Sequence, residues 1–187
     1  TKRFEVNDVL LICGDPRGGT TWLAELIKLL PTTAMLWEPL AVAKVNQFKS
    51  VGFQWRQYIP EHESWPEAKT LFEDLFAGKM LSSYLCQSTS TKDIARANQL
   101  LIKFCRANQL LPWLTKEFQF SRPPIYLVRH PCAVVASQLK QGGWSHVKPN
   151  FEIPNGRYNS FYSDHTDFLR AIDTIEMRLA ATWCLCN

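Results

Sequence analysis

Short apolar runs alternate along this chain with segments in which apolar residues recur at helical spacing. The first run, Val9–Cys13, is apolar throughout and ends at Gly14. A continuous apolar run of this length is typical of a strand that is buried on both faces, as strands of parallel sheets are. Three further segments are interpreted as strands, and the full set is 9–13, 33–37, 99–104 and 124–128.

The helical segments are predicted from the spacing of their apolar residues, at 20–30, 66–85, 110–120, 132–140 and 165–186. Pro31 ends the first of them, and Pro66 suits the first turn of the second. Strands that alternate with helices predict a parallel sheet covered on both faces. The expected fold is therefore a three-layer α/β domain, in which residues 39–65 and 142–164 form irregular, aromatic-rich segments.

Composition, net charge and cysteine pattern exclude several classes of protein. The chain has 187 residues, enough for one domain with a core, and 46% are hydrophobic, which argues against disorder. The net charge of +4 suits an anionic ligand but is too small to indicate nucleic acid. The six cysteines form no C-x-x-C pair and no set with zinc spacing, so neither a metal site nor a disulfide framework is expected. No stretch approaches the roughly 20 apolar residues of a membrane span.

The segment Gly14–Thr21 follows the first predicted strand and opens the first helix, which is the context that a phosphate-binding loop requires. In such a loop, backbone N–H groups and the positive end of the helix dipole face one anion. Gly14 and Gly19 have the Walker A spacing, but Thr20 stands where the Walker lysine belongs, so ATP hydrolysis is not favoured. Arg17 offers a planar guanidinium instead. The alternative is an ordinary strand–turn–helix junction.

The sequence Pro-Arg-Gly-Gly-Thr-Thr-Trp-Leu at 16–23 resembles the 5′-phosphosulfate loop of sulfotransferases that use 3′-phosphoadenosine 5′-phosphosulfate (PAPS). The family pattern is P-[KR]-[SA]-G-[TS]-[TS]-[WF]-L, and the chain departs from it at Gly18, which keeps only the backbone contacts. The resemblance implies a P-loop-like α/β fold, PAPS as co-substrate, 3′-phosphoadenosine 5′-phosphate (PAP) as product, and no metal. In this loop it assigns PAPS binding to Arg17, Gly18, Gly19, Thr20, Thr21 and Trp22.

A second motif follows the fourth predicted strand. Arg129 and Ser137, eight residues apart, resemble the family's R-x-P motif and the serine beyond it, which bind the 3′-phosphate. His130 stands where aspartate is commoner and is interpreted as a neutral variant at the helix start, not as a base. Taken alone, an arginine before a proline is usually only the end of a strand. Together with the first motif it indicates PAPS, and the resemblance spans 9–139.

Sulfuryl transfer needs a base for the acceptor hydroxyl and positive charge on the leaving phosphate oxygen. Glu38, after the second predicted strand, resembles the base of Golgi-type and tyrosyl-protein sulfotransferases; the alternative is a helix start. Lys103 ends the third strand, in the region where related enzymes carry a lysine that stabilises the bridging oxygen; the alternative is a solvated strand end. Arg106 and Lys92 are its substitutes, and Arg17 completes the predicted catalytic set.

The positions of these residues support one another. Arg17, Glu38, Lys103 and Arg129 each lie just past the carboxyl end of a predicted strand. In an open parallel α/β sheet, ligands bind along that edge. The topology therefore predicts that the four side chains line one site.

The segments Phe48–Trp65 and Trp144–Tyr162 are candidate acceptor loops, because aromatic residues stack on sugars and bases such as His146 and Arg157 hold anionic glycans. The alternative is that their aromatics anchor the loops. The expected acceptor is a hydroxyl on a carbohydrate or other metabolite, with no nucleic-acid partner. The rivals are a P-loop kinase of a small molecule and a nucleotide-binding module without turnover.

One sulfotransferase domain is expected over 1–187. Because Asn187 lies inside a predicted helix, a truncation at the C-terminus stays open. The cysteine pattern favours a reducing compartment, so a cytoplasmic location is expected. A Golgi-lumenal domain is the alternative if an upstream anchor is missing.

Overall fold

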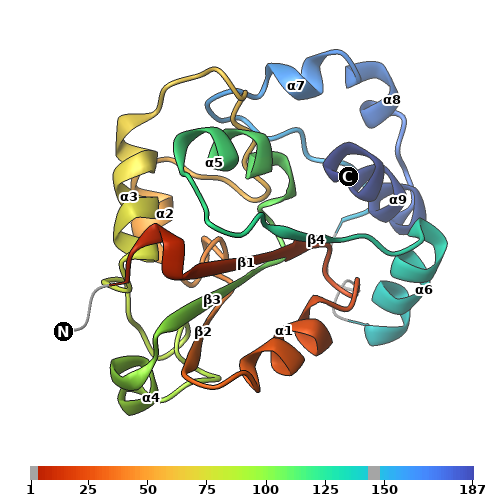
Figure 1. Cartoon of the computed structure of the whole chain (residues 1–187). Helices are drawn as coiled ribbons and strands as arrows, with labels where there is room; N and C mark the ends of the chain where they lie inside the picture. The colour runs from red at the N-terminus through yellow and green to blue at the C-terminus, as the bar shows by residue number, and fades with distance from the viewer. Residues whose placement is uncertain (1–3, 143–147) are drawn as a thin grey trace.

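A sheet of four parallel strands, in the order β2-β3-β1-β4, forms the centre of the described structure (Figure 1). The computed structural model describes residues 4–142 and 148–187. The strands are β1 (Val9–Gly14), β2 (Thr33–Trp37), β3 (Gln99–Phe104) and β4 (Ile125–Leu127). The predicted α/β fold with a parallel sheet is confirmed, and the predicted strands agree with these bounds to within one residue at each end.

Helices surround the sheet, and their starts follow local signals. Gly19 has a left-handed backbone (φ 103°) and begins the first helix, while Pro131 occupies the first turn of the helix after β4. The helices are α1 (Thr20–Lys28), α2 (Asn46–Ser50), α3 (Pro66–Phe76), α4 (Thr91–Arg96), α5 (Leu111–Glu117), α6 (Pro131–Gln141), α7 (Ser160–Ser163), α8 (Thr166–Arg170) and α9 (Ile175–Cys186), with 3₁₀ turns η1 (Val6–Asp8) and η2 (Asn108–Leu110).

Side chains of the sheet alternate between two hydrophobic clusters, one on each face, because successive residues of a strand point in opposite directions. Ile12, Met35 and Leu101 pack against Ala24 of α1. The residues between them along the strands join a larger cluster to which α3 and α5 contribute. Figure 1 shows α1 on one side of the sheet and α3 and α5 on the other, so the sheet is the middle of three layers.

Two of the predicted helices differ most from the observed ones. The segment 66–85 is helical only to Phe76, because Gly78 turns left-handed (φ 68°) and donates its N–H to the carbonyl of Leu75 (3.0 Å). The chain then runs back to β2, where the carbonyl of Leu85 accepts from the N–H of Trp37 (2.9 Å). The predicted helix 165–186 is divided into α8 and α9, because Thr174 caps α9 by accepting from the N–H of Met177.

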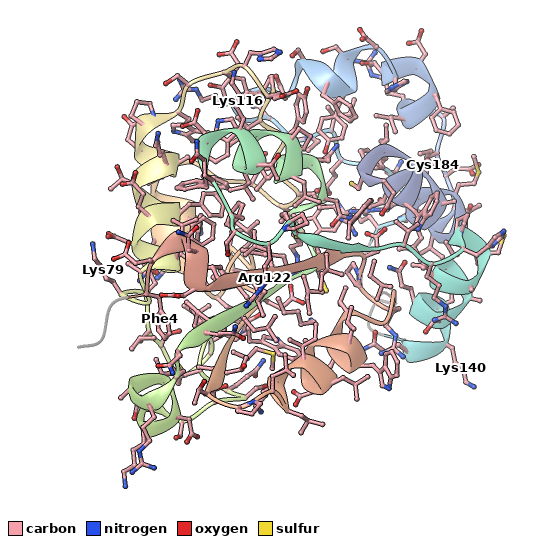
Figure 2. The ribbon with its side chains drawn as sticks, in the orientation of Figure 1. Phe4, Lys79, Lys116, Arg122, Lys140 and Cys184 are labelled. Carbon is pink, nitrogen blue, oxygen red and sulfur yellow. The ribbon has the colours of Figure 1, made fainter. Side chains whose placement is uncertain are left out.

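All six cysteines are free thiols in this structure. No helix in the described ranges is long and apolar enough to cross a membrane. Charged residues such as Lys79 and Lys140 point away from the ribbon, while Cys184 lies at the periphery on α9 (Figure 2).

Phe72 on α3 holds the larger cluster together, since it is fully buried and contacts the rings of Phe48, Phe76 and Trp113. We expect Phe72→Ala to lower the free energy of unfolding by about 3–5 kcal/mol, because it leaves a cavity. The matched control is Phe168→Ala, whose ring is 58% exposed and should change stability by less than about 0.5 kcal/mol. Urea denaturation checks both, and equal losses would contradict the assignment of the core.

Candidate active site

A pocket of about 560 Å³ opens at the carboxyl edge of the sheet. Its walls come from the loop between β1 and α1, the ends of β2 and β3, the junction between β4 and α6, and the second half of α6. The residues that line it are Pro16, Arg17, Gly19, Thr20, Thr21, Trp22, Glu38, Lys103, Cys105, Arg129, Ser137 and Gln141. The structure thus brings the predicted residues into one pocket, except Gly18, which is buried in the loop beneath.

The loop from Asp15 to Gly19 is a tight turn. Arg17 has a left-handed backbone (φ 69°), and the N–H of Gly18 donates to the carbonyl of Asp15 (2.9 Å). A Cβ on Gly18 would lie 2.8 Å from that carbonyl oxygen, so a larger residue would force the backbone to move. This contact gives a physical reason for glycine where the family pattern has serine or alanine. The first turn of α1 follows, with Thr20 facing the pocket.

The two anion motifs touch each other. The Nε of Arg17 donates to the Oγ of Ser137 (3.1 Å), and Nη1 of Arg129 donates to the carbonyl oxygen of Arg17 (3.1 Å). Gln138, the next residue on α6, donates from Nε2 to the carbonyl of Pro16 (3.1 Å). Two segments that lie far apart in the sequence therefore form one wall of the pocket, with two guanidinium groups on it.

The opposite wall carries a buried ion pair. The Nζ of Lys103 lies 2.5 Å from Oε1 of Glu38, and the two side chains are only 2% and 8% exposed. The other carboxylate oxygen, Oε2, accepts from the N–H of Cys105 (3.0 Å) and from Nη1 of Arg106 (3.2 Å). The ammonium of Lys103 also lies 4.0 Å from the centre of the Trp37 ring. Lys103 is thus a desolvated, ion-paired residue and not a solvated strand end.

Lys92 lies elsewhere. It is exposed on α4, which precedes the amino end of β3, and it does not line the pocket. His130 occupies the residue before α6, but its side chain makes no capping hydrogen bond. Of the three cations considered for the leaving oxygen, only Lys103 and Arg106 contact Glu38.

Cys105 is a pocket residue that the sequence reasoning missed. Its Sγ lies 3.4 Å from Oγ1 of Thr20 and 3.5 Å from Nζ of Lys103. Burial, followed by the nearby carboxylate of Glu38, raises the pKa of this thiol to about 12, so it stays protonated at neutral pH. Its position two residues after Lys103, on the same face of the strand end, is the signal that could have revealed it.

The two predicted acceptor segments contact each other within the part of the chain that the structure describes. Gln54 and Gln57 donate from Nε2 to the carbonyls of Asn155 (2.6 Å) and Arg157 (2.7 Å). Phe53 stacks on Trp65 in the core, so these aromatics anchor the loop. Trp144 and His146 lie outside the described residues. A second pocket, of about 370 Å³, lies between the segments and is lined by Gln54, Trp55, Phe151, Glu152, Ile153, Pro154, Asn155 and Arg178.

A parallel α/β sheet with a basic pocket at its carboxyl edge, beside a buried carboxylate and ammonium, defines a group-transfer site for an anionic ligand. The chain belongs to the sulfotransferase family: the family model described as "Sulfotransferase domain" matches residues 7–177. Membership makes sulfuryl transfer its reaction class. No curated protein and no solved structure matches the chain in the comparisons. Within residues 4–142 and 148–187, no group of three or more metal-ligating side chains could hold an ion.

The raised pKa of Cys105 allows a test of the buried environment around Lys103 and Glu38. At pH 8 a thiol with a pKa of about 12 is ionised in roughly one molecule in ten thousand, and the thiolate is the reactive form. We expect iodoacetamide to label the exposed Cys132 and Cys184 while Cys105 stays unmodified, as read by peptide mass spectrometry. Unfolded protein, in which all six should react, is the control. Equal labelling of Cys105 in the folded protein would contradict this environment.

Proposed function

We propose that this sulfotransferase takes the sulfuryl group from PAPS and transfers it to an acceptor hydroxyl. The single observation that supports this donor is the direct contact between Arg17 and Ser137, which joins the two anion motifs in one pocket. A nucleotide with anionic groups at both its 5′ and 3′ positions matches two adjacent arginine-bearing loops. ATP has no 3′-phosphate for the second of them.

The donor-binding residues divide between the two ends of PAPS. The loop N–H groups of Gly18 and Gly19, the first turn of α1 with Thr20 and Thr21, and the guanidinium of Arg17 face the 5′-phosphosulfate in this proposal. Arg129 and Ser137 bind the 3′-phosphate. Trp22, at the rim of the pocket, is 68% exposed, and its indole face offers a stacking surface for the base.

Glu38 and Lys103 are the proposed catalytic pair, with Arg17 beside them. The acceptor hydroxyl gives its proton to Oε1 of Glu38, its oxygen forms a bond to sulfur, and the bond from sulfur to the phosphate oxygen breaks to leave PAP. Lys103 stabilises the negative charge that develops on the leaving oxygen. In the structure Lys103 contacts Oε1, whereas Cys105 and Arg106 hold Oε2. Movement of Lys103 to the donor therefore frees Oε1 as the base while Oε2 stays fixed.

The acceptor is proposed to be a hydroxyl on a carbohydrate or another metabolite. The Glu-type base supports this through its resemblance to Golgi-type enzymes. The pocket with Trp55, Glu152 and Arg178 adds an aromatic face and both charges, which suit a polar, ring-shaped acceptor. A cytoplasmic location is proposed because the six cysteines are all free thiols.

Calorimetric titration tests the donor. We expect PAP to bind and ATP·Mg²⁺ to bind much more weakly, because only PAP carries the 3′-phosphate. Arg17→Ala and Arg129→Ala should each weaken PAP binding about 10- to 100-fold, the worth of a charge-assisted hydrogen bond of roughly 1.5–3 kcal/mol. Lys140→Ala, an exposed cation on the same helix as Ser137, is the matched control and should bind as wild type does. Tighter binding of ATP·Mg²⁺ than of PAP would favour the kinase.

Single-turnover and steady-state assays test the catalytic pair. A screen with radiolabelled PAPS over glycans, lipids and peptides first supplies an acceptor. Glu38→Gln should then lower kcat about 10²- to 10⁴-fold, because the amide cannot take the hydroxyl proton. It also removes the ion-pair partner of Lys103, but its amide has nearly the same shape as the carboxylate, so PAP affinity should be retained. Lys103→Met should lower kcat as well, because the charge on the leaving oxygen is no longer stabilised. A sulfuryl donor whose leaving group has a lower pKa needs less of this stabilisation and should partly restore the rate of the variant. Unchanged transfer by Glu38→Gln would show that another group is the base.

A further inference from the structure

A second buried ion pair involves the first residue of the phosphosulfate loop and does not line the pocket. Oδ1 of Asp15 lies 2.5 Å from Nη2 of Arg56, and each side chain is only 4% exposed. Asp15 immediately precedes Pro16, and its carbonyl accepts the N–H of Gly18. Asp15 therefore has two roles: its carboxylate pairs with Arg56, and its carbonyl accepts the hydrogen bond that closes the turn of the loop.

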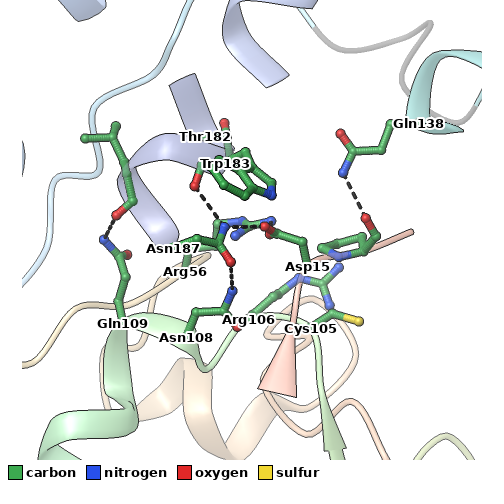
Figure 3. A network of polar contacts seen from close by, with 12 residues as sticks. Asp15, Arg56, Cys105, Arg106, Asn108, Gln109, Gln138, Thr182, Trp183 and Asn187 are labelled. Atoms are coloured by element: carbon green, nitrogen blue, oxygen red, sulfur yellow. Dashed lines mark hydrogen bonds and ion pairs between the residues drawn. The ribbon is translucent and has the colours of Figure 1, made fainter. Parts of the chain in front are cut away.

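The second carboxylate oxygen of Asp15 has a different partner. Oδ2 accepts from Nδ2 of Asn187, which follows α9 (Figure 3). The amide oxygen of Asn187 in turn accepts from Nδ2 of Asn108 (3.2 Å) and from the hydroxyl of Tyr126 (2.5 Å). Asp15 is thus fixed by two segments at once, the loop that carries Arg56 and the end of α9, which is itself tied to η2 and β4.

Stability alone is a poor explanation for this arrangement. Two charges have been taken out of water, and apolar side chains of similar volume commonly stabilise such a position as well or better. Nε and Nη1 of Arg56 are buried without a hydrogen-bond partner, and its backbone is left-handed (φ 55°), which is unfavourable for a residue with a side chain. The pair does fix geometry, because a charge-assisted hydrogen bond sets the orientation of the Asp15 carboxylate.

We propose that Asp15 and Arg56 are positioning residues that set the orientation of the loop at 14–19 toward the donor. This inference rests on the proposed function, since it names the 5′-phosphosulfate end as what the loop receives. The pair does not line the pocket, so it acts through the backbone of the loop. A displacement of the loop by about 1 Å would stretch its hydrogen bonds to the donor beyond hydrogen-bond range, and the loss of one such bond to a charged group weakens binding about tenfold or more.

A charge-neutral double variant separates positioning from folding. Asp15→Asn or Arg56→Gln alone leaves an unpaired buried charge and should lower the melting temperature strongly. Asp15→Asn with Arg56→Gln removes both charges, so its melting temperature should return toward that of wild type. Its PAP affinity, by titration calorimetry, should stay about tenfold or more below wild type, because a loop that the ion pair no longer orients loses at least one hydrogen bond to the anionic donor. A double variant in which both the melting temperature and the PAP affinity return to the wild-type values would overturn the proposal.

Hydrogen exchange of the ligand-free protein gives a readout that does not depend on PAP. Amides of the loop peptide that covers 14–21 should exchange faster in the double variant than in wild type, while those of β3 should not change. Lys69→Gln with Glu117→Gln removes an ion pair between α3 and α5 (2.9 Å) and is the matched control, with no effect on the loop. Failure of wild type to bind PAP would reject the proposed donor, whereas unchanged loop exchange in the double variant would reject the positioning role.

Discussion

The register of the parallel sheet is the constraint on which the site depends. Ile12 of β1 pairs with Lys103 of β3, and Lys103 pairs with Trp37 of β2, so the carboxyl ends of the three strands lie within two residues of one level. Glu38 therefore meets Lys103 directly, and the loop after Gly14 opens beside both. A slip of one residue in β3 would turn Lys103 to the opposite face of the sheet. The chemistry at this edge is thus set by backbone pairing in the core.

Two buried ion pairs flank the loop between β1 and α1, and they differ in access. The pair of Glu38 with Lys103 lines the pocket, so an anion bound there can take the place of Glu38 as the partner of Lys103. The pair of Asp15 with Arg56 is closed to solvent and to the pocket, so nothing that enters can exchange with it. The pair of Glu38 with Lys103 can therefore change partners during a reaction, whereas the pair of Asp15 with Arg56 keeps the geometry of the loop fixed. Both keep a carboxylate next to the loop to which we assign the donor.

Much of this arrangement could be predicted from sequence, for identifiable reasons. The strands 33–37 and 99–104 were predicted with the observed bounds because each is a compact apolar run between polar residues. The ends of two helices were missed because the signals are single residues, Gly78 and Thr174, whose effect depends on the chain that follows. Arg17 and Arg129 belong to motifs, whereas Arg56 has no periodic signal, and its partner is 41 residues away. Only the folded chain could reveal that pair.

If the pocket binds PAPS as proposed, the contact between Arg17 and Ser137 also determines how the two ends of the donor influence each other. Because the loop and α6 share this hydrogen bond and that of Arg129 to the carbonyl of Arg17, the two anion sites have a fixed separation. A molecule that spans both sites gains the second contact at high effective concentration, without a further loss of translational freedom. Two separate phosphate ions gain no such advantage. Under the proposed function the pocket acts as a bidentate receptor, in which the separation of the two anions contributes to selectivity as well as their charge.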